Sequence, residues 1–311
     1  MLTVAVISQH ILLPLLILFW MSGRRYVPLF NVRTRIEARA LFAAFAFYMA
    51  FILVCGAWPI VGYWLRPLIL ALFAVAATAF FRGFGGVPRE PAGPATWLKT
   101  SFFIATAALF CVYFIIGVAG WRQPREAVDL AFPLAGGLYV VGQGGAAPII
   151  NHHYAFKSQR HALDLEKIGA AGFRAAGIFP KDPSRYEVFG DVVTSPCDGR
   201  VVFARDGLED AVGAQTEAER PAGNVVALEC AGATVFLAHL AKGSLAVKEG
   251  QTVVAGDALG RVGNSGNTTE PHLHIHAERG PFAGEFSQNP GLAMRFDGRV
   301  LVRGSLFFNP G

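Results

Sequence analysis

The residues best suited to chemistry are histidines, which gather in the second half of the chain. Seven of the eight occur there: His152, His153, His161, His239, His272, His274 and His276. The segment GNTTEPHLHIHAE spaces three of them by two residues, and its proline suits the first residue of a strand. On a strand, side chains two residues apart share a face. Three aligned imidazoles therefore favour a metal site over a merely polar sheet face.

A zinc site would make use of such a row. Catalytic zinc combines three nitrogen, sulfur or oxygen ligands from the protein with an open position for water. His274 is a candidate ligand, and Asp164 is a candidate carboxylate because it lies in an apolar, strand-like run where an unpaired carboxylate would be costly. A helix N-cap is the alternative role for Asp164. We expect His276 to face solvent rather than to support a ligand.

The second half of the chain reads as an all-β domain that would carry these residues. Short apolar segments bounded by Gly, Asn, Asp or Pro recur along it: YVV, NVVALE, TVFLAHL, TVVAG, HLHIHA and RVLVRG. We predict a domain of antiparallel sheets over residues 142–311, preceded by a linker over 122–141. A weaker helical pattern covers residues 164–176, and the polar stretch 205–223 predicts a surface loop.

The first half predicts a membrane anchor. The chain is 53% hydrophobic and 16% charged, with a mean hydropathy of +0.42, which excludes an ordinary soluble globule and a disordered chain. A helix needs about 20 apolar residues to cross about 30 Å of hydrocarbon. We predict a four-helix transmembrane bundle over residues 1–121, with spans at 3–21, two within 41–81, and one at 101–120. We interpret His10, in the first span, as a helix-packing residue.

Charge is divided unevenly between the halves and indicates an orientation. Residues 1–121 hold nine basic and two acidic residues, whereas the remainder holds 18 basic and 20 acidic residues. The basic residues concentrate in the two loops that follow the first and third spans: Arg24, Arg25, Arg33, Arg35, Arg39, Arg82, Arg89 and Lys99. By the positive-inside rule these loops are cytoplasmic, so everything after residue 120 faces outward. Because the basicity belongs to the membrane half, we expect no nucleic-acid partner.

Two of the four cysteines, Cys197 and Cys230, lie in the outward-facing half. A disulfide is permitted outside the cytoplasm, but separate strands must bring the two thiols together. The sequence leaves open both a disulfide between these residues and two buried free thiols.

Three segments, taken in order, carry a resemblance to a known family: SPCDGRVVF, GNVVALE and FLAHLAKGSLAVKEGQTVVAGDALGRVGNSGNTTEPHLHIHAE. They resemble the lysostaphin/LytM-type zinc metallopeptidases, which cut peptide cross-links in bacterial peptidoglycan. The resemblance covers about residues 142–279 and is most specific where a histidine strand, a Gly-delimited hairpin and HLH follow one another in the family's order. It implies a lysostaphin/LytM peptidase-like fold with Zn2+ as cofactor.

The resemblance also implies roles for four residues. His274 and Asp164 match zinc ligands, whereas His239 and His272 match the two catalytic histidines. The catalytic pair would orient and deprotonate a zinc-activated water or stabilise the tetrahedral oxyanion.

The position of the family's first zinc ligand is occupied here by Arg160, which stays protonated and cannot ligate. The resemblance implies that members with an NHH…QR-A-x-D arrangement supply this ligand from the preceding segment, so NHHYAFKSQRHALDL points to His153. A hairpin around residues 156–158 would bring it beside the aspartate. His152 and His161 are the alternatives, although an offset of three from the aspartate places His161 on the opposite face of a regular strand.

Together these features predict a zinc-dependent endopeptidase that is multi-pass in the bacterial inner membrane, with its catalytic domain facing the periplasm or the cell exterior. Its partners would be a peptidoglycan stem or cross-bridge peptide and the lipid bilayer, with a regulatory membrane or periplasmic protein left open. Arg160 motivates the alternative of a degenerate, non-catalytic domain that binds cell wall or activates another hydrolase. A lipoyl-carrier-like barrel would leave the three aligned histidines unexplained and lacks a lysine at a hairpin tip.

Overall fold

The chain forms two compact units, Met1–Val118 and Ala119–Gly311, in a computed structural model. The structure describes residues 2–22, 32, 34–84, 93–122, 124, 126–214, 217–285 and 289–311. Four basic residues of the predicted cytoplasmic loops, Arg24, Arg25, Arg33 and Arg89, lie outside the described residues.

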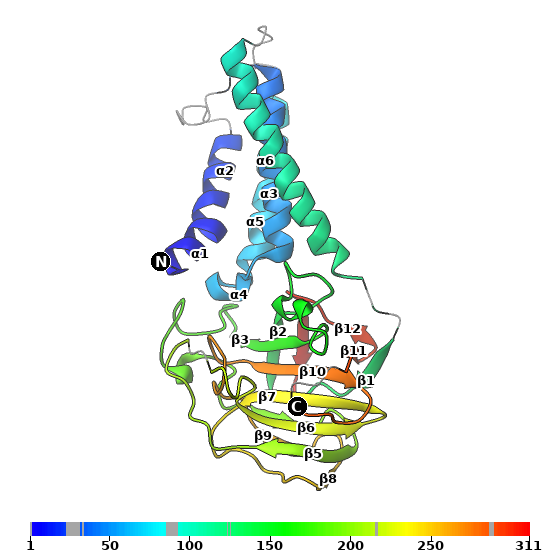
Figure 1. Cartoon of the computed structure of the whole chain (residues 1–311). Helices are drawn as coiled ribbons and strands as arrows, with labels where there is room; N and C mark the ends of the chain where they lie inside the picture. The colour runs from blue at the N-terminus through cyan, green and yellow to red at the C-terminus, as the bar shows by residue number, and fades with distance from the viewer. Residues whose placement is uncertain are drawn as a thin grey trace. The chain divides into compact units, whose positions relative to one another are not determined.

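The first unit is helical (Figure 1). Its elements are α1 Leu2–Ile7, a π-helical segment Ser8–Leu12, α2 Leu13–Met21, α3 Arg35–Cys55, α4 Trp58–Val61, α5 Leu65–Gly83 and α6 Pro94–Ala119. Four stretches are long and apolar enough to cross a membrane, namely Leu2–Met21, Arg35–Cys55, Leu65–Gly83 and Pro94–Ala119. These four stretches correspond to the four predicted spans, and their outward-facing surfaces are apolar, as lipid requires.

A polar cluster joins the first helix to the end of α3. His10 is 3% exposed, and its Nε2 accepts a hydrogen bond from the backbone N–H of Ala57 at 3.0 Å, just before α4. The hydroxyl of Tyr48 donates to the carbonyl of Gln9 at 2.6 Å, within the π-helical segment where regular helical bonding is interrupted. His10 therefore packs helices and caps a turn, in line with the interpretation from sequence.

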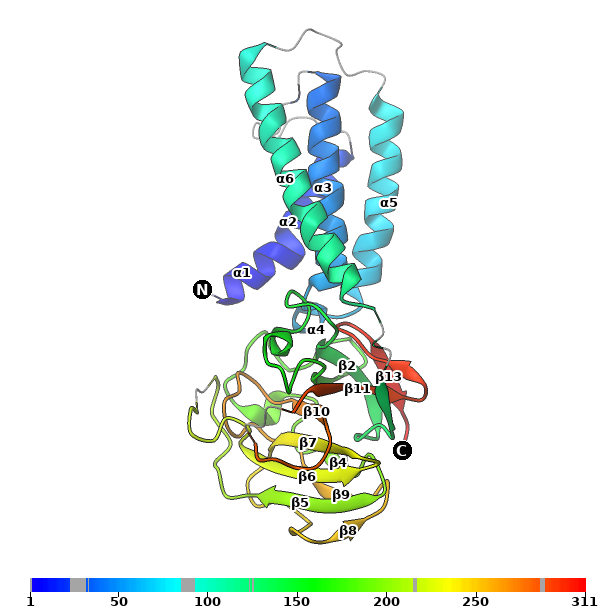
Figure 2. The same cartoon turned by 45° about the vertical axis from the view of Figure 1, so that its right-hand side comes forward.

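The second unit is built from antiparallel strands (Figure 2), which confirms the predicted fold class. Its strands are β1 Ala127–Leu130, β2 Gly137–Gln143, β3 Leu163–Ile168, β4 Val192–Thr194, β5 Gly199–Arg205, β6 Asn224–Cys230, β7 Ala233–Leu240, β8 Thr252–Val253, β9 Ala258–Arg261, β10 Leu273–Arg279, β11 Gly291–Phe296, β12 Arg299–Val300 and β13 Leu306–Asn309. The described strands form one large sheet in the order β13-β2-β3-β10-β7-β6-β5-β8, with β11 also paired to β10, and a small sheet of β4 and β9. The exception to antiparallel pairing among them is β1, which runs parallel to β11.

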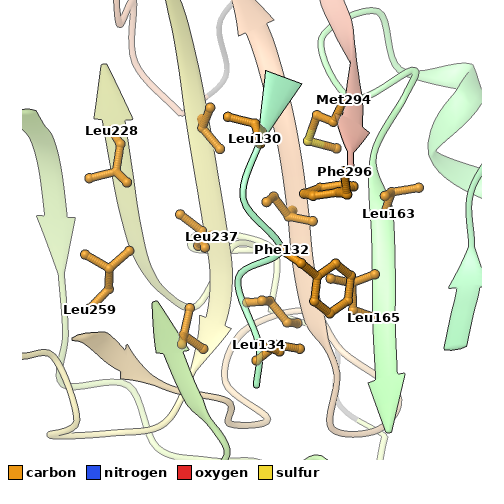
Figure 3. Packing of buried hydrophobic residues seen from close by; sticks show 14 of the residues in the cluster. Leu130, Phe132, Leu134, Leu163, Leu165, Leu228, Leu237, Leu259, Met294 and Phe296 are labelled. Carbon is orange, nitrogen blue, oxygen red and sulfur yellow. The ribbon is translucent and has the colours of Figure 1, made fainter. Parts of the chain in front are cut away.

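One face of the large sheet forms the hydrophobic core. Along β10 the side chains of Leu273, Ile275 and Ala277 enter this core, so the intervening residues project from the opposite face. Figure 3 shows Phe132 packed over the same core between Leu165 and Leu237. Full burial of each such side chain stabilises the domain by about 1.5–3 kcal/mol. The core therefore fixes which face of β10 is left for the histidines.

The helical pattern predicted over residues 164–176 is wrong. Residues 163–168 form β3, which pairs with β2 on one side and β10 on the other, and residues 169–176 contain no helix. Pairing on both edges outweighs the local preference for helix. The predicted loop at 205–223 is present in its described part, except that Arg205 is the last residue of β5.

Cys197 and Cys230 form a disulfide, with their Cα atoms 6.0 Å apart. The bond ties the segment before β5 to the end of β6. Of the two alternatives that the sequence leaves open, the structure contains the bridge.

Candidate metal centre

Three potential ligands converge on the polar face of the large sheet. His274 on β10 lies directly opposite Asp164 on β3 in the antiparallel register. The Nδ1 of His274 is 3.1 Å from Oδ1 of Asp164, and the Nε2 of His153 is 3.0 Å from the same oxygen. All three residues are buried, with exposures of 9% for His153, 6% for Asp164 and 4% for His274.

His153 reaches this point from a short helical turn rather than from a hairpin. It belongs to the 3-10 helix His152–Ala155, and the side chain of Asn151 accepts a hydrogen bond from the backbone N–H of His153 at 3.1 Å. The amide of Asn151 in turn donates to the carbonyl of Gly145 at 3.0 Å, and Asn151 is fully buried. The expected hairpin around residues 156–158 is therefore replaced by a capped turn anchored through Asn151.

The donor types, and the two separations that Asp164 makes with the imidazoles, fit a zinc ion. Zinc takes imidazole nitrogen and carboxylate oxygen at about 2.0–2.1 Å, so neighbouring ligands of a tetrahedral site lie about 3.3 Å apart. The separations of 3.0 and 3.1 Å from Asp164 to the two imidazoles are close to that spacing. Two imidazoles and one carboxylate leave one tetrahedral position for water or substrate.

A second grouping shares two of these residues. One ligand atom each from His152, His153 and Asp164 lie within 4.8 Å of one another. The ring of His152 lies 3.8 Å from that of His153, but His152 is exposed. We favour His274 as the third ligand because it is buried and is the direct register partner of Asp164.

The contacts of Arg160 and His161 are made with residues outside this centre. The guanidinium of Arg160 stacks over the ring of Tyr154 at 4.9 Å. His161 lines a small cavity with Leu163 and Met294, two residues of the hydrophobic core. His161 lies in the turn before β3 begins at Leu163, so strand parity does not apply to it.

Two further histidines complete the centre, and main-chain carbonyls orient both. The ring of His239 lies 4.8 Å from that of His272 and 5.8 Å from that of His274. The Nδ1 of His239 donates to the carbonyl of Ser265 at 2.8 Å, and the Nδ1 of His272 donates to the carbonyl of Glu270 at 2.8 Å. In a neutral imidazole with Nδ1 protonated, Nε2 carries the lone pair. In its neutral form each ring therefore offers Nε2 as a proton acceptor, and the Nε2 of His272 lies 3.6 Å from Oδ1 of Asp164.

The carbonyl that orients His239 is itself held firmly. Ser265 is fully buried, and its hydroxyl donates to the carbonyl of Leu240 at 2.7 Å while accepting from the backbone N–H of Asn224 at 2.9 Å. His239 has φ +61°, in the left-handed region that non-glycine residues seldom adopt. Such strain persists where surrounding contacts impose it, often at functional sites.

The carbonyl that orients His272 is supported by a buried ion pair. The Nε of Arg174 donates to Oε1 of Glu270 at 2.9 Å, and a second guanidinium nitrogen contacts the other carboxylate oxygen. Arg174 is 2% exposed. The hydroxyl of Thr268 also donates to the Glu270 carbonyl, at 2.9 Å. These contacts fix the segment that leads into β10.

Burial and charge set the protonation states of the cluster. Burial would raise the pKa of Asp164, but the charges of His153 and His272 and hydrogen bonds hold it well below its ordinary value. Burial, together with the charge of His272, lowers the pKa of His239 to about 3. Burial and then the charge of His153 lower the pKa of His274 well below its ordinary value. At neutral pH the aspartate is thus anionic and these two imidazoles are neutral, as metal ligation and general-base chemistry require.

His276 does not face solvent, contrary to the expectation from sequence. It is 5% exposed, and its ring stacks on Phe236 with centroids 4.6 Å apart and an interplanar angle of 8°. Strand parity places His276 on the face of His274, but aromatic residues from β7 and from the segment after β10 cover that part of the face. Solvent exposure could not be read from parity alone.

Four residues around the centre were not predicted from the sequence. Ser265 and Glu270 act through main-chain carbonyls, and Arg174 acts through Glu270, so no sequence pattern identifies these three. Glu278 had a signal, because it continues the alternation of the HLHIHAE row on the same strand face.

Comparison with known proteins gives a family match within the β unit. The family model described as Peptidase family M23 matches residues 186–283, a range that includes His239, His272 and His274. Among curated proteins, none matches the chain significantly.

Several solved structures are similar at low identity. The catalytic domain of lysostaphin from Staphylococcus simulans is 20% identical, with 52% of this chain and 87% of that chain covered and a TM-score of 0.27. A zinc-containing peptidase from Vibrio cholerae is 19% identical, with 54% and 37% covered and a TM-score of 0.28. Csd3 from Helicobacter pylori is 20% identical, with 49% and 30% covered and a TM-score of 0.28. The chain spans 50%, 40% and 37% of the length of three of the matched structures.

Proposed function

We propose that this chain, whose β unit carries a peptidase family M23 domain, is a membrane-anchored zinc endopeptidase that hydrolyses peptide bonds in peptidoglycan cross-links. The observation that carries the proposal is the convergence of His153, Asp164 and His274, with separations of 3.0 and 3.1 Å from the carboxylate to the imidazoles. Two more histidines with oriented rings stand beside them. This arrangement provides both a metal site and proton acceptors.

The three ligands would hold the metal, and the other two histidines would manage protons. Zinc supplies Lewis acidity, which polarises a carbonyl and lowers the pKa of water from about 15.7 toward about 7. His239 and His272 present Nε2 lone pairs, because their Nδ1 protons are engaged with carbonyls. One of them accepts the proton of the attacking water, and the proton is then returned to the leaving amine as the C–N bond breaks. The other, in its protonated form, donates its Nε2–H to the oxyanion.

The membrane unit would place this chemistry outside the cytoplasm. Four apolar helices anchor the chain, and the excess of basic residues in the loops after the first and third spans assigns those loops to the cytoplasmic side. The second unit then emerges on the outer face of the inner membrane. The disulfide between Cys197 and Cys230 supports the same compartment, since such bonds persist in oxidising surroundings.

Zinc analysis of the full-length chain in detergent tests the ligand assignment. We expect about one zinc per chain in the wild type, and loss of zinc in His153→Ala and in His274→Ala. His152→Ala and His161→Ala are matched controls, because they remove neighbouring imidazoles that we place outside the ligand set. Retention of zinc by His153→Ala together with loss of zinc in His152→Ala would reassign the first ligand.

Release of fragments from purified cross-linked muropeptides tests the activity. We expect cleavage by the wild type and none by His274→Ala. A chain that binds zinc but cleaves none of these substrates would instead fit a non-catalytic domain that binds cell wall or activates another hydrolase. Zinc-free wild-type protein would refute the metallopeptidase proposal itself.

A further inference from the structure

Strand β10 carries two further buried polar side chains beyond the candidate ligand His274. His276 and Glu278 follow at intervals of two, so all three share one face of the strand. The Nε2 of His274 lies 3.0 Å from Nδ1 of His276, and the Nε2 of His276 lies 3.5 Å from Oε1 of Glu278. The side chain of Glu278 is 0% exposed and that of His276 is 6% exposed. A row of side chains thus leads from the metal centre to a fully buried carboxylate.

The chemistry of a metal-ligating imidazole sets the direction of this row. When Nδ1 of His274 holds a metal, its lone pair is used there, so the proton of the neutral ring sits on Nε2. That N–H points at Nδ1 of His276 and donates to it. The proton of His276 is then on its own Nε2, which lies 3.5 Å from Oε1 of Glu278, at ion-pair distance but without hydrogen-bond geometry. The first N–H is therefore directed away from the metal, and the second lies beside a buried carboxyl group.

The surroundings keep this row dry and in place. His276 stacks on Phe236, and the ring of Phe282 lies 5.9 Å from that of Phe236. Glu278 lies opposite Thr234 on β7 and opposite Gly291 on β11, between two neighbouring strands. Away from water, a carboxylate acts on a neighbouring N–H more strongly than it would at the surface.

We propose that His276 and Glu278 are positioning residues of the metal centre, which fix the tautomer and the ring orientation of His274 and increase its strength as a ligand. A metal-ligating histidine commonly donates its second N–H directly to a carboxylate or a carbonyl. Here one additional imidazole stands between the ligand and the carboxylate. The inference rests on the proposed zinc site, and its test reads metal affinity rather than activity.

Zinc affinity of the full-length chain in detergent, measured by competition with a chelator of known affinity, tests the proposal. We expect Glu278→Gln to bind zinc about 10–100-fold more weakly than the wild type, which is the usual effect of losing a partner of a metal-ligating histidine. His276→Phe keeps an aromatic ring on Phe236 but removes the acceptor for His274, and we expect a loss at least as large. Thr234→Val is the matched control, because it removes a buried hydroxyl opposite Glu278 that lies outside the row. Its zinc affinity should equal that of the wild type.

The double variant tests whether Glu278 acts on His274 through His276, an arrangement that we call the relay, or whether the two residues have independent structural effects. If Glu278 acts through His276, then His276→Phe/Glu278→Gln binds zinc no more weakly than His276→Phe alone. Additive losses would overturn the relay. Thermal unfolding of each metal-free variant verifies that it is folded, and Glu278→Gln preserves side-chain volume, so it carries the test even if His276→Phe fails to fold.

The two proposals fail in distinguishable ways. A wild-type chain that binds no zinc overturns the proposed function and, with it, the role of His276 and Glu278. A wild-type chain that binds zinc, with Glu278→Gln binding within about threefold of it, overturns the relay and leaves the proposed function standing.

Discussion

The disulfide between Cys197 and Cys230 makes a quantitative prediction about both stability and cellular compartment. The two residues are 33 positions apart, and closing a loop of that length in the unfolded chain corresponds to about 4 kcal/mol at 25 °C in the chain-entropy account. Their Cα separation of 6.0 Å lies in the ordinary range for a disulfide, so the native strands need no shift to form the bond. For a domain of this size, 1 kcal/mol shifts the melting temperature by about 2–4 °C. Reduction should therefore lower the melting temperature of the β unit by about 8–16 °C.

Calorimetry of the full-length chain in detergent, with and without a reductant, measures this shift. Comparison of oxidised and reduced wild type leaves the packing atoms unchanged, unlike a substitution. Cys230→Ala is the control, since it cannot form the bond and its transition should not respond to the reductant. A reduced wild type that melts within about 2 °C of the oxidised form would refute the loop-entropy reasoning.

The same bond reports on topology in the cell. Alkylation of intact cells followed by mass analysis should find Cys197 and Cys230 protected until a reductant is added. If both thiols are alkylated without reduction, the bond does not form where the protein resides. The outward orientation of the β unit would then be wrong, because that orientation supplies the oxidising surroundings.

Three further predictions concern the centre and its supports. Gly266 has φ +86°, and a Cβ there would overlap neighbouring backbone, whereas Gly232 has φ +81° and open space around it. Denaturant unfolding should therefore show that Gly266→Ala lowers the free energy of unfolding by about 1–3 kcal/mol more than Gly232→Ala does. Equal losses would contradict a steric role. Arg174→Met breaks a buried ion pair, and the same assay should show a loss of about 3–5 kcal/mol; a loss below 1 kcal/mol would show that the pair is dispensable. In the metal-free chain, burial would lower the pKa of His153, but the charge of Asp164 together with hydrogen bonds to Asp164 and Gln159 raises it above 6.5, and the pKa of Asp164 is lowered well below 3.8. The His153–Asp164 pair then contributes its full stabilisation between about pH 3.8 and 6.5. That stabilisation is lost as the pH rises through the folded-state pKa of His153, and in stronger acid as Asp164 becomes protonated. The melting temperatures of metal-free wild type and His153→Gln should therefore converge above the folded-state pKa of His153, and a difference that stays constant with pH would contradict the assignment.

Strand parity accounts for most of what the sequence could predict about the centre. The spacing of His272, His274 and His276 placed them on one face, and the apolar residues between them fixed that face as the one away from the core. The same reasoning set His161 apart from Asp164, but His161 lies in a turn before β3, where parity does not apply. Strand parity predicts the face correctly because side chains alternate between the two faces of a strand, which follows from backbone geometry alone and needs no information from other segments.

Burial and long-range pairing were beyond that reasoning. The exposure of His276 depends on Phe236, which comes from another strand, and no local pattern reports such a neighbour. The segment after Asp164 has a helical pattern, yet β2 and β10 pair with both edges of β3 and make it a strand. In both cases the deciding contact comes from a distant part of the chain.

The position of the proposed first ligand, His153, shows why Arg160 does not by itself imply a degenerate site. Asp164 and His274 are held by the register between two strands, so neither can move along the chain without changing face. His153 instead sits on a short turn capped by Asn151, outside the strand ladder. A turn can deliver an imidazole to the carboxylate from several positions in the sequence, since only the end point in space matters. A chain without a ligand at residue 160 can therefore still have a complete donor set, provided that the turn is anchored. Asn151→Ala should then weaken zinc binding, because the side chain of Asn151 holds the backbone of His153 in place. Zinc affinity of Asn151→Ala equal to that of the wild type would show that the turn needs no such anchor.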